Sequence, residues 1–159
     1  MHITKSKSYK FYNSTACEYD KIRFSGTAGK WGTSIQEQII SDHASKWKNM
    51  RILEVGCGTG RCTDMLLTLG CKNIVAVEPA AEMISIARKR CAHGVEKKYV
   101  QFILSDIESL DSKLPSYDVV MFVNVFSRLP NAEELVGKLV GLLRTGGILF
   151  FNFQCLSSI

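Results

Sequence analysis

Three acidic residues stand at the ends of apolar stretches, where their carboxylates could bind a ligand. Glu54 lies near the end of residues 50–55, and Glu78 and Asp106 close two later stretches. Short, continuous apolar runs bounded by turn residues are typical of strands buried in a parallel sheet. Because parallel strands end at one edge of their sheet, we expect the carboxylates to gather there and to accept hydrogen bonds from hydroxyl or amino groups.

A glycine-rich turn follows the first apolar stretch directly. Glycine stands at positions 56, 58 and 60, and a helical pattern begins at Arg61. Glycine adopts positive φ and places no Cβ between the chain and a ligand, while a helix N-terminus offers unpaired N–H groups. The turn therefore favours a flat, polar or anionic ligand. A buried Glu54 beside it should accept a hydrogen bond or attract a cationic group.

The spacing of the glycines argues against a dinucleotide. The dinucleotide-binding turn reads G-x-G-x-x-G, which from Gly56 requires glycine at the position of Arg61. Nicotinamide-dependent oxidoreductase chemistry is therefore disfavoured.

The run Glu54-Val-Gly-Cys-Gly-Thr-Gly60 resembles the first motif of the class I S-adenosylmethionine-dependent methyltransferases. The stretch as far as Phe151 is similar to their type 11 group, which is related to the quinone-biosynthesis enzymes. The resemblance implies S-adenosyl-L-methionine as the cofactor, with its amino-acid end near Glu54. It also implies that Glu78 takes the ribose hydroxyls and that Asp106 accepts a hydrogen bond from the adenine amino group.

The resemblance gives a set of expected cofactor contacts, and several of them also have a structural interpretation. Glu78 could be a plain strand-end carboxylate, Asp106 could cap the turn 107–110, and Met83 could be a core residue. The expected contacts are Glu54, Gly56, Cys57, Gly58, Gly60, Glu78, Pro79, Met83, Asp106, Ile107, Asn124 and Tyr19.

The order of predicted elements indicates an α/β fold that would position these residues. We expect a doubly wound, Rossmann-like parallel sheet of order 3-2-1-4-5 in three layers. The predicted strands are 50–55, 73–79, 99–106, 117–124 and 148–153. The predicted helices are 16–20, 34–47, 61–69, 80–91 and 132–143, with turns at 23–30 and 143–147.

The chain is expected to form one compact domain with two parts. Residues 1–48 would form a helical cap and lid, and residues 49–159 the cofactor-binding core. Tyr19-Asp20 followed by Arg23-Phe-Ser-Gly26 resembles the N-terminal segment of type 11 and quinone-pathway enzymes. That resemblance implies a cofactor contact through the Tyr19 hydroxyl, although a surface turn with a core tyrosine fits these residues equally well.

The acceptor-facing side gives no catalytic residue. The family often has histidine or glutamate just before a Leu/Val-Pro pair, and this chain has Ser127 and Arg128 there. It also lacks the Asp/Asn-Pro-Pro-aromatic sequence of enzymes that methylate amide or adenine nitrogens. A small-molecule or lipid-like acceptor is therefore expected, with the catalytic residues unknown.

Family members usually continue after the fifth strand through a helix and two antiparallel strands, which are expected to be missing here. The open edge of residues 148–153 would invite pairing with a second copy or a partner protein. The alternative to a methyltransferase is a non-catalytic subunit that binds S-adenosylmethionine, or a truncated fragment of an enzyme.

Composition limits the remaining classes. The chain has 159 residues, and 46% of them are hydrophobic. It has no apolar run near the ~18 residues that a membrane span needs, and no secretory signal is evident, so a cytoplasmic protein is expected. Its six cysteines form no C-x-x-C pair and have no histidine at ligand spacing, which predicts reduced thiols and no metal. The net charge is +5, but the clusters of basic residues have no aromatic residues among them of the kind that a groove for single-stranded nucleic acid would have. Nucleic acid is therefore not an expected partner.

Overall fold

A computed structural model describes residues 5–110, 116–124 and 132–152 of the chain. Five strands form one sheet in the order β3-β2-β1-β4-β5, and every neighbouring pair is parallel. The strands are β1 (Arg51–Val55), β2 (Asn73–Glu78), β3 (Val100–Leu104), β4 (Tyr117–Phe122) and β5 (Leu143–Phe151). The predicted doubly wound fold and strand order are confirmed.

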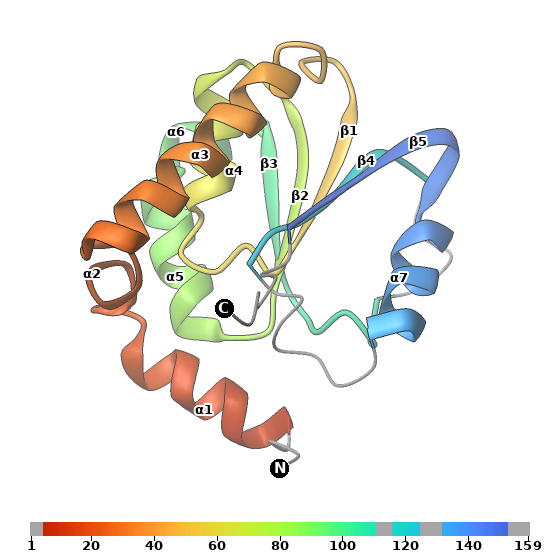
Figure 1. Cartoon of the computed structure of the whole chain (residues 1–159). Helices are drawn as coiled ribbons and strands as arrows, with labels where there is room; N and C mark the ends of the chain where they lie inside the picture. Colours follow the sequence, from red (N-terminus) through yellow and green to blue (C-terminus); the bar gives the residue numbers. More distant parts are fainter. Residues whose placement is uncertain (1–4, 111–115, 125–131, 153–159) are drawn as a thin grey trace, which may run out of the picture.

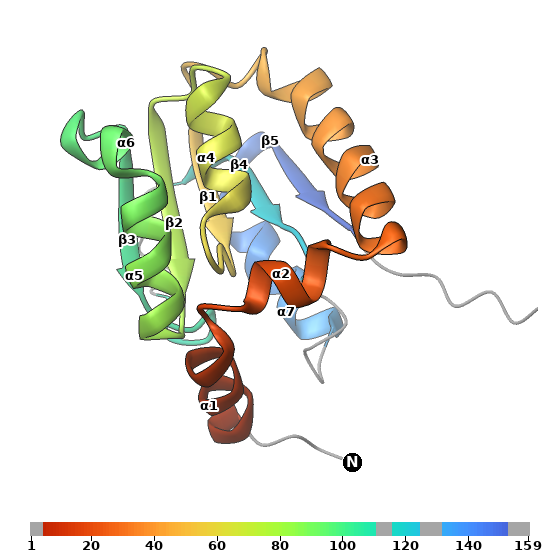
Figure 2. The ribbon, with the colours of Figure 1, turned by 90° about the vertical axis from the view of Figure 1, so that its left-hand side faces the viewer.

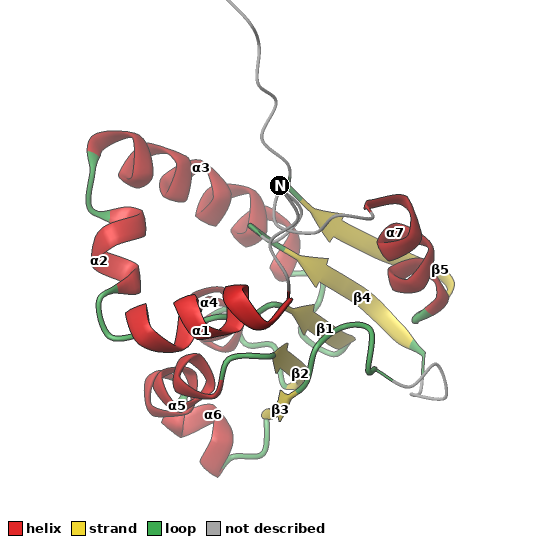
Figure 3. Ribbon diagram, turned by 90° about the horizontal axis from the view of Figure 1, so that it is seen from below, coloured by secondary structure: helices red, strands yellow, loops and turns green. Residues whose placement is uncertain are grey.

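Helices cover both faces of the sheet, which gives three layers (Figures 1 and 3). The described helices are α1 (Lys5–Thr15), α2 (Tyr19–Phe24), α3 (Thr27–Ala44), α4 (Arg61–Thr68), α5 (Ala81–Arg90), α6 (Ala92–Glu96) and α7 (Ala132–Gly141). One core cluster joins α3, α4 and α5 to the sheet around Trp47, Ile52 and Leu66. A second core joins α7 to the opposite face around Leu53, Val120 and Leu139.

The central strand explains why its sequence is almost continuously apolar. β1 pairs with β2 on one side and β4 on the other, and residues 52–55 are all buried. Side chains of a strand alternate between the two faces, so a strand covered on both faces needs apolar residues at successive positions. Glu54 is the one charged residue among these four buried positions, and a buried carboxylate is unfavourable without a partner.

The helical cap differs from the prediction. The helix expected at 16–20 is instead α2 at Tyr19–Phe24, and the turn expected at 23–30 is confined to residues 25–26. Only residues 16–18 separate α1 from α2, and only residues 25–26 separate α2 from α3. Gly29 permits the tight corner, because a Cβ there would lie 2.8 Å from the carbonyl oxygen of Arg23. Figure 2 shows α1 and α2 beyond the ends toward which the strands point.

The last strand is longer and less regular than predicted. β5 includes the expected turn, and its pairing with β4 jumps from Tyr117↔Leu143 to Val119↔Ile148. Gly146 has a φ of +74°, so a glycine supplies the positive φ as predicted. Beyond β5, the described residues provide no further strand, and Ile148 and Phe151 are 39% and 41% exposed. Pairing of this edge with a second copy or a partner stays a prediction.

The longest described helix, α3, has 18 residues and exposes polar side chains along its length. None of the helices within the described ranges combines the length and apolar character that crossing a membrane would require.

The start of α4 lies very close to α5. Gly60 has a φ of +79°, and a Cβ built on it would lie 2.9 Å from the Cβ of Ala87 in α5. Gly58 has a φ of +54°, but a Cβ there would have no atom within 4 Å. The two glycines are therefore required for different reasons, one by packing and backbone conformation and the other by backbone conformation alone.

This difference predicts unequal effects of two alanine substitutions. Gly58→Ala should lower the free energy of unfolding by about 1 kcal/mol, the strain of a left-handed alanine. Gly60→Ala should lower it by about 3 kcal/mol, because overpacking against α5 adds to that strain. Urea denaturation followed by circular dichroism measures both values. Equal losses for the two variants would show that α4 and α5 do not approach this closely.

Candidate functional site

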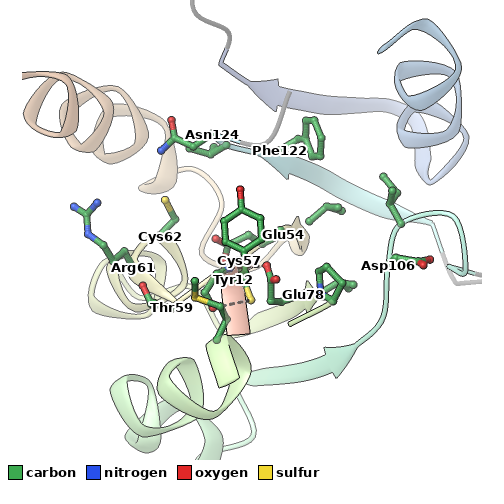
Figure 4. Close-up of a pocket in the computed structure, with 18 of the residues that line it drawn as sticks. Tyr12, Glu54, Cys57, Thr59, Arg61, Cys62, Glu78, Asp106, Phe122 and Asn124 are labelled. Atoms are coloured by element: carbon green, nitrogen blue, oxygen red, sulfur yellow. Dashed lines mark hydrogen bonds between the residues drawn. The ribbon is translucent and has the colours of Figure 1, made fainter. Parts of the chain in front are cut away.

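A pocket lies at the carboxyl end of the sheet, between β1, β2 and β4 and beneath the cap helices (Figure 4). Its empty space is about 1100 Å³ when the solvent at its mouth is included. All the expected cofactor contacts apart from Gly60 line it, namely Tyr19, Glu54, Gly56, Cys57, Gly58, Glu78, Pro79, Met83, Asp106, Ile107 and Asn124. Residues predicted from distant parts of the sequence are therefore brought to one cavity.

The glycine turn forms the floor of the pocket. Gly56, Gly58 and Gly60 have φ angles of +74°, +54° and +79°, which confirms the predicted left-handed conformations. The N–H groups of Gly56 and Cys57 donate to the carbonyl oxygen of Val77, at 2.8 and 3.1 Å. The turn is thus bonded to the end of β2 and presents backbone, with little side chain, to the cavity.

Glu54 is a buried carboxylate with one hydrogen-bond donor beside it. Its side chain is 3% exposed, and the Thr63 hydroxyl donates to its Oε2 at 2.5 Å. Burial raises the pKa of Glu54 to about 7, and the nearby Glu78 contributes, while the Thr63 hydrogen bond lowers it. Among the described residues, no cationic side chain pairs with Glu54. A cationic ligand group would therefore stabilise its charged form.

Glu78 lies opposite, at the end of β2. The N–H of Ala80 donates to its Oε1 at 3.0 Å, and the N–H of Gly58 donates to its Oε2 at 3.1 Å. Burial raises the pKa of Glu78, partly offset by these two hydrogen bonds. A carboxylate oxygen can accept more than one hydrogen bond. Glu78 can therefore hold the glycine turn and still accept hydrogen bonds from ligand hydroxyls.

Asp106 and Ile107 form part of the wall beyond β3. The Asp106 Oδ1 accepts a hydrogen bond of 2.7 Å from the N–H of Ser109, so the predicted capping interaction is present. Ile107 is 6% exposed and packs in the core cluster that includes Leu110. Both residues also line the pocket, so the capping role does not remove Asp106 from the site.

Asn124 occupies the wall at the end of β4, where the strand order reverses beside β1. Its φ of +62° is unusual for a residue other than glycine. Gln36 of α3 donates from Nε2 to Asn124 Oδ1, and Asn124 donates from Nδ2 to Gln36 Oε1, both at 3.3 Å. Asn152 Nδ2 also donates to Asn124 Oδ1, at 2.9 Å. Strained backbone held by side-chain bonds is characteristic of binding sites.

Aromatic side chains of the cap close the pocket from above. Tyr12, Tyr19 and Phe24 all line it, and their rings meet edge to face, with centroids 5.9 and 6.1 Å apart. Figure 4 shows the Tyr12 ring reaching over the cavity. Arg61, at the start of α4, lies over the Phe24 ring at 4.0 Å and pairs with Glu37 at 2.8 Å. Met83 is 1% exposed and thus serves both the core and the pocket.

Tyr12, Phe24 and Gln36 are pocket residues that the sequence did not indicate. Tyr12 comes from α1, a helix that was not predicted, and Phe24 and Gln36 come from helices whose boundaries were predicted wrongly or imprecisely. No short motif marks these three residues. Ser127 and Arg128, the residues in place of the family's usual histidine or glutamate, lie outside the described residues.

The arrangement can bind a ligand that presents hydroxyl groups to Glu78 and a cation to Glu54, over a floor of bare backbone. A pocket at the carboxyl ends of the strands, where the strand order reverses, is the usual ligand site of doubly wound folds. Fold and site together define a Rossmann-like α/β protein with a ligand pocket at the point where the strand order reverses.

A sequence profile described as "Methyltransferase domain" matches residues 53–149. The chain belongs to the S-adenosylmethionine-dependent methyltransferase family, whose cofactor is S-adenosylmethionine.

The similar curated proteins carry O-methyltransferase names. A malonyl-[acyl-carrier protein] O-methyltransferase of Bacillus cereus is 36% identical over 151 residues, covering 94% of this chain and 53% of that protein. A ubiquinone biosynthesis O-methyltransferase of Xanthomonas campestris is 29% identical over 104 residues, covering 64% of this chain and 42% of that protein. The chain thus spans about half the length of the relatives it matches.

Solved structures share the fold. Magnesium protoporphyrin IX methyltransferase from Synechocystis PCC 6803, with bound SAM, has a TM-score of 0.70 at 19% identity, covering 90% of this chain and 73% of that one. The DhpI–SAH complex has a TM-score of 0.68 at 21% identity, covering 90% and 65%.

The raised pKa of Glu54 predicts a pH-dependent stability. Because its folded-state pKa of about 7 exceeds the ordinary value of 4.5, its contribution is fully present below pH 4.5 and is lost as pH rises through about 7. As pH rises from 4.5 to 8, the unfolding free energy of wild type should therefore fall by about 2–3 kcal/mol relative to that of Glu54→Gln. Urea denaturation across this range measures it. A difference that does not vary with pH would contradict the burial of an ionisable Glu54.

Proposed function

We propose that the chain binds S-adenosyl-L-methionine in this pocket and transfers its methyl group to a small-molecule or lipid-like acceptor. One observation carries the proposal: the buried carboxylates of Glu54 and Glu78 flank the glycine turn and open into the same cavity. The family membership of the chain supports the same cofactor.

The residues present fit the chemical groups of this cofactor. Glu54 lacks a cationic partner among the described residues, so it suits the ammonium of the amino-acid end. Glu78 can accept hydrogen bonds from both ribose hydroxyls, because each of its oxygens already bonded to backbone retains acceptor capacity. Asp106 suits the adenine amino group, with Ile107 and Met83 as apolar surfaces for the ring.

Methyl transfer from this cofactor is an in-line displacement, in which the bound sulfonium supplies an electrophilic methyl group and leaves as a neutral thioether. The protein's part is to align and desolvate the reactants, which by itself can supply much of the rate. The rings of Tyr12, Tyr19 and Phe24 line the cavity and can shield bound reactants from water. The amides of Gln36 and Asn124 lie on the wall at the β1–β4 switch point, the side open to an acceptor. An acceptor that is already an anion, such as a carboxylate or a phenolate, has no proton to lose, so the step then needs no catalytic base.

We infer an oxygen nucleophile for the acceptor, because the similar curated proteins are named O-methyltransferases. We also place the protein in the cytoplasm. The five described cysteines are unpaired thiols, which suits a reducing compartment.

The second candidate is a protein that binds S-adenosylmethionine without transferring the methyl group. It is favoured by one feature of the sequence, that Ser127 and Arg128 stand where the family often has histidine or glutamate. The two candidates share the cofactor site and differ only in turnover.

Isothermal titration calorimetry tests the shared site, and a methyl-transfer assay then separates the candidates. We expect wild type to bind S-adenosylmethionine at micromolar concentrations and not to bind NADH. Glu78→Ala should weaken binding by at least about a hundredfold, since two hydrogen bonds to a charged group are lost. Gly58→Val should also abolish binding, because the added side chain enters the space above the turn.

Circular dichroism is the control for both variants, which should retain the spectrum of wild type. Unchanged affinity in both would show that the nucleoside binds elsewhere. Transfer of the methyl group to any small oxygen acceptor would exclude the non-catalytic candidate.

A further inference from the structure

Three residues far apart in the sequence form a closed ring of hydrogen bonds beside the pocket; Thr59 lines the pocket, and Asp20 and Arg90 do not. Asp20 is in α2, Thr59 is in the glycine turn, and Arg90 is the last residue of α5. The Thr59 hydroxyl donates to Asp20 Oδ1 at 2.7 Å, and Arg90 Nη2 donates to Asp20 Oδ2 at 2.5 Å. Arg90 Nη1 donates to the Thr59 hydroxyl at 3.1 Å and to the Thr59 carbonyl oxygen at 3.0 Å.

The ring acts on the floor of the pocket through Thr59. This residue is 4% exposed and lies between Gly58 and Gly60, which both have positive φ. Glu78 holds the turn from one side through the N–H of Gly58, and Arg90 holds it from the other through the Thr59 carbonyl oxygen. A glycine-rich turn has many accessible conformations when free, so these two attachments select the one that accepts a ligand.

The same ring acts on the wall of the pocket through Asp20. Tyr19 directly precedes Asp20, lines the pocket and contacts the rings of Tyr12 and Phe24. The pair of Asp20 and Arg90 is only partly exposed, with side-chain exposures of 32% and 28%. Arg90 therefore ties the aromatic wall and the glycine floor to the same point on α5.

We propose that Arg90 is a positioning residue for the cofactor, which makes the glycine turn and the Tyr19 segment adopt their binding conformations together. Arg90 does not line the pocket, so it acts only through Thr59 and Asp20. The inference rests on the proposed cofactor site and adds to it a coupling between the cap and the turn.

The chain offers a matched control two positions earlier. Arg88 lies on the same helix and donates from Nη2 to the carbonyl oxygen of Phe102 on β3 at 2.9 Å. It has the same charge and is more exposed than Arg90, but its partner is not part of the pocket. Both variants, Arg88→Met and Arg90→Met, remove a guanidinium group from the same helix. Only Arg90→Met also removes a connection to the site.

Calorimetric titration with S-adenosylhomocysteine compares the two variants. We expect Arg90→Met to raise the dissociation constant about tenfold, which corresponds to the loss of roughly one hydrogen bond to a charged group. Arg88→Met should leave it within about twofold of wild type. Arg90→Lys should recover only part of the loss, since one ammonium cannot replace the two-pronged contact with Thr59 and Asp20.

A second readout separates positioning from general stability. In Arg90→Met, amide hydrogen exchange should rise in residues 57–60 and 17–24 together, and in Arg88→Met it should rise in neither. If Arg90→Met fails to fold, Asp20→Asn provides the same comparison, because it keeps the size of the side chain and weakens the ring. Where Arg90→Met does fold, the double variant Asp20→Asn/Arg90→Met should lose less affinity than the sum of the single losses.

Two results overturn the inference in distinguishable ways. Failure of wild type to bind S-adenosylhomocysteine removes the proposed function and this inference with it. Binding by wild type, with equal affinities in folded Arg88→Met and Arg90→Met, overturns the positioning role of Arg90 alone.

Discussion

The structure depends on holding two carboxylates, Glu54 and Glu78, away from water at the edge of the sheet. A buried carboxylate is unfavourable unless hydrogen bonds or a cation compensate its charge. The Thr63 hydroxyl serves Glu54, and the N–H groups of Gly58 and Ala80 serve Glu78. Burial nevertheless raises the pKa of both carboxyl groups, so this compensation is incomplete. A ligand that brings an ammonium and hydroxyls would complete it, which is why the fold and the proposed cofactor fit one another.

Polar bonds join the cap to the elements of the pocket. Arg61 of α4 pairs with Glu37 of α3, and the Asn13 side chain of α1 accepts a hydrogen bond from the first turn of α5 at Glu82. The end of α3 and the turn after it also pack against the sheet through the buried side chains of Ile40, Ala44 and Trp47, whereas a smaller apolar cluster of Ala16, Ala80 and Met83 joins the α1–α2 connection to the start of α5. Polar, partly exposed attachments of this kind open more readily than a packed core, so a ligand beneath the cap would also stabilise the cap.

The sequence predicted those parts of the structure that local patterns determine. The apolar strands, the positive φ of the glycines and the placement of Glu78 follow from residues within a few positions of one another, and all are present in the structure. The ring of Asp20, Thr59 and Arg90 could not be predicted, because its members are 31 and 70 positions apart and no motif connects them. The cap helices were misplaced for a related reason: α2 has six residues, too few for a helical pattern, and tertiary bonds hold it.

The pH dependence of ligand affinity tests most directly whether Glu54 is kept for a cationic group. Titrations of S-adenosylmethionine and of 5′-methylthioadenosine, which has the nucleoside without the amino acid, should be compared between pH 5.5 and 7. With a Glu54 pKa of about 7, the affinity for S-adenosylmethionine should rise by up to about tenfold per pH unit, because binding favours the ionised carboxylate. The affinity for 5′-methylthioadenosine should rise much less, and Glu54→Gln should remove the difference. Equal pH dependence of the two ligands in wild type would contradict the account.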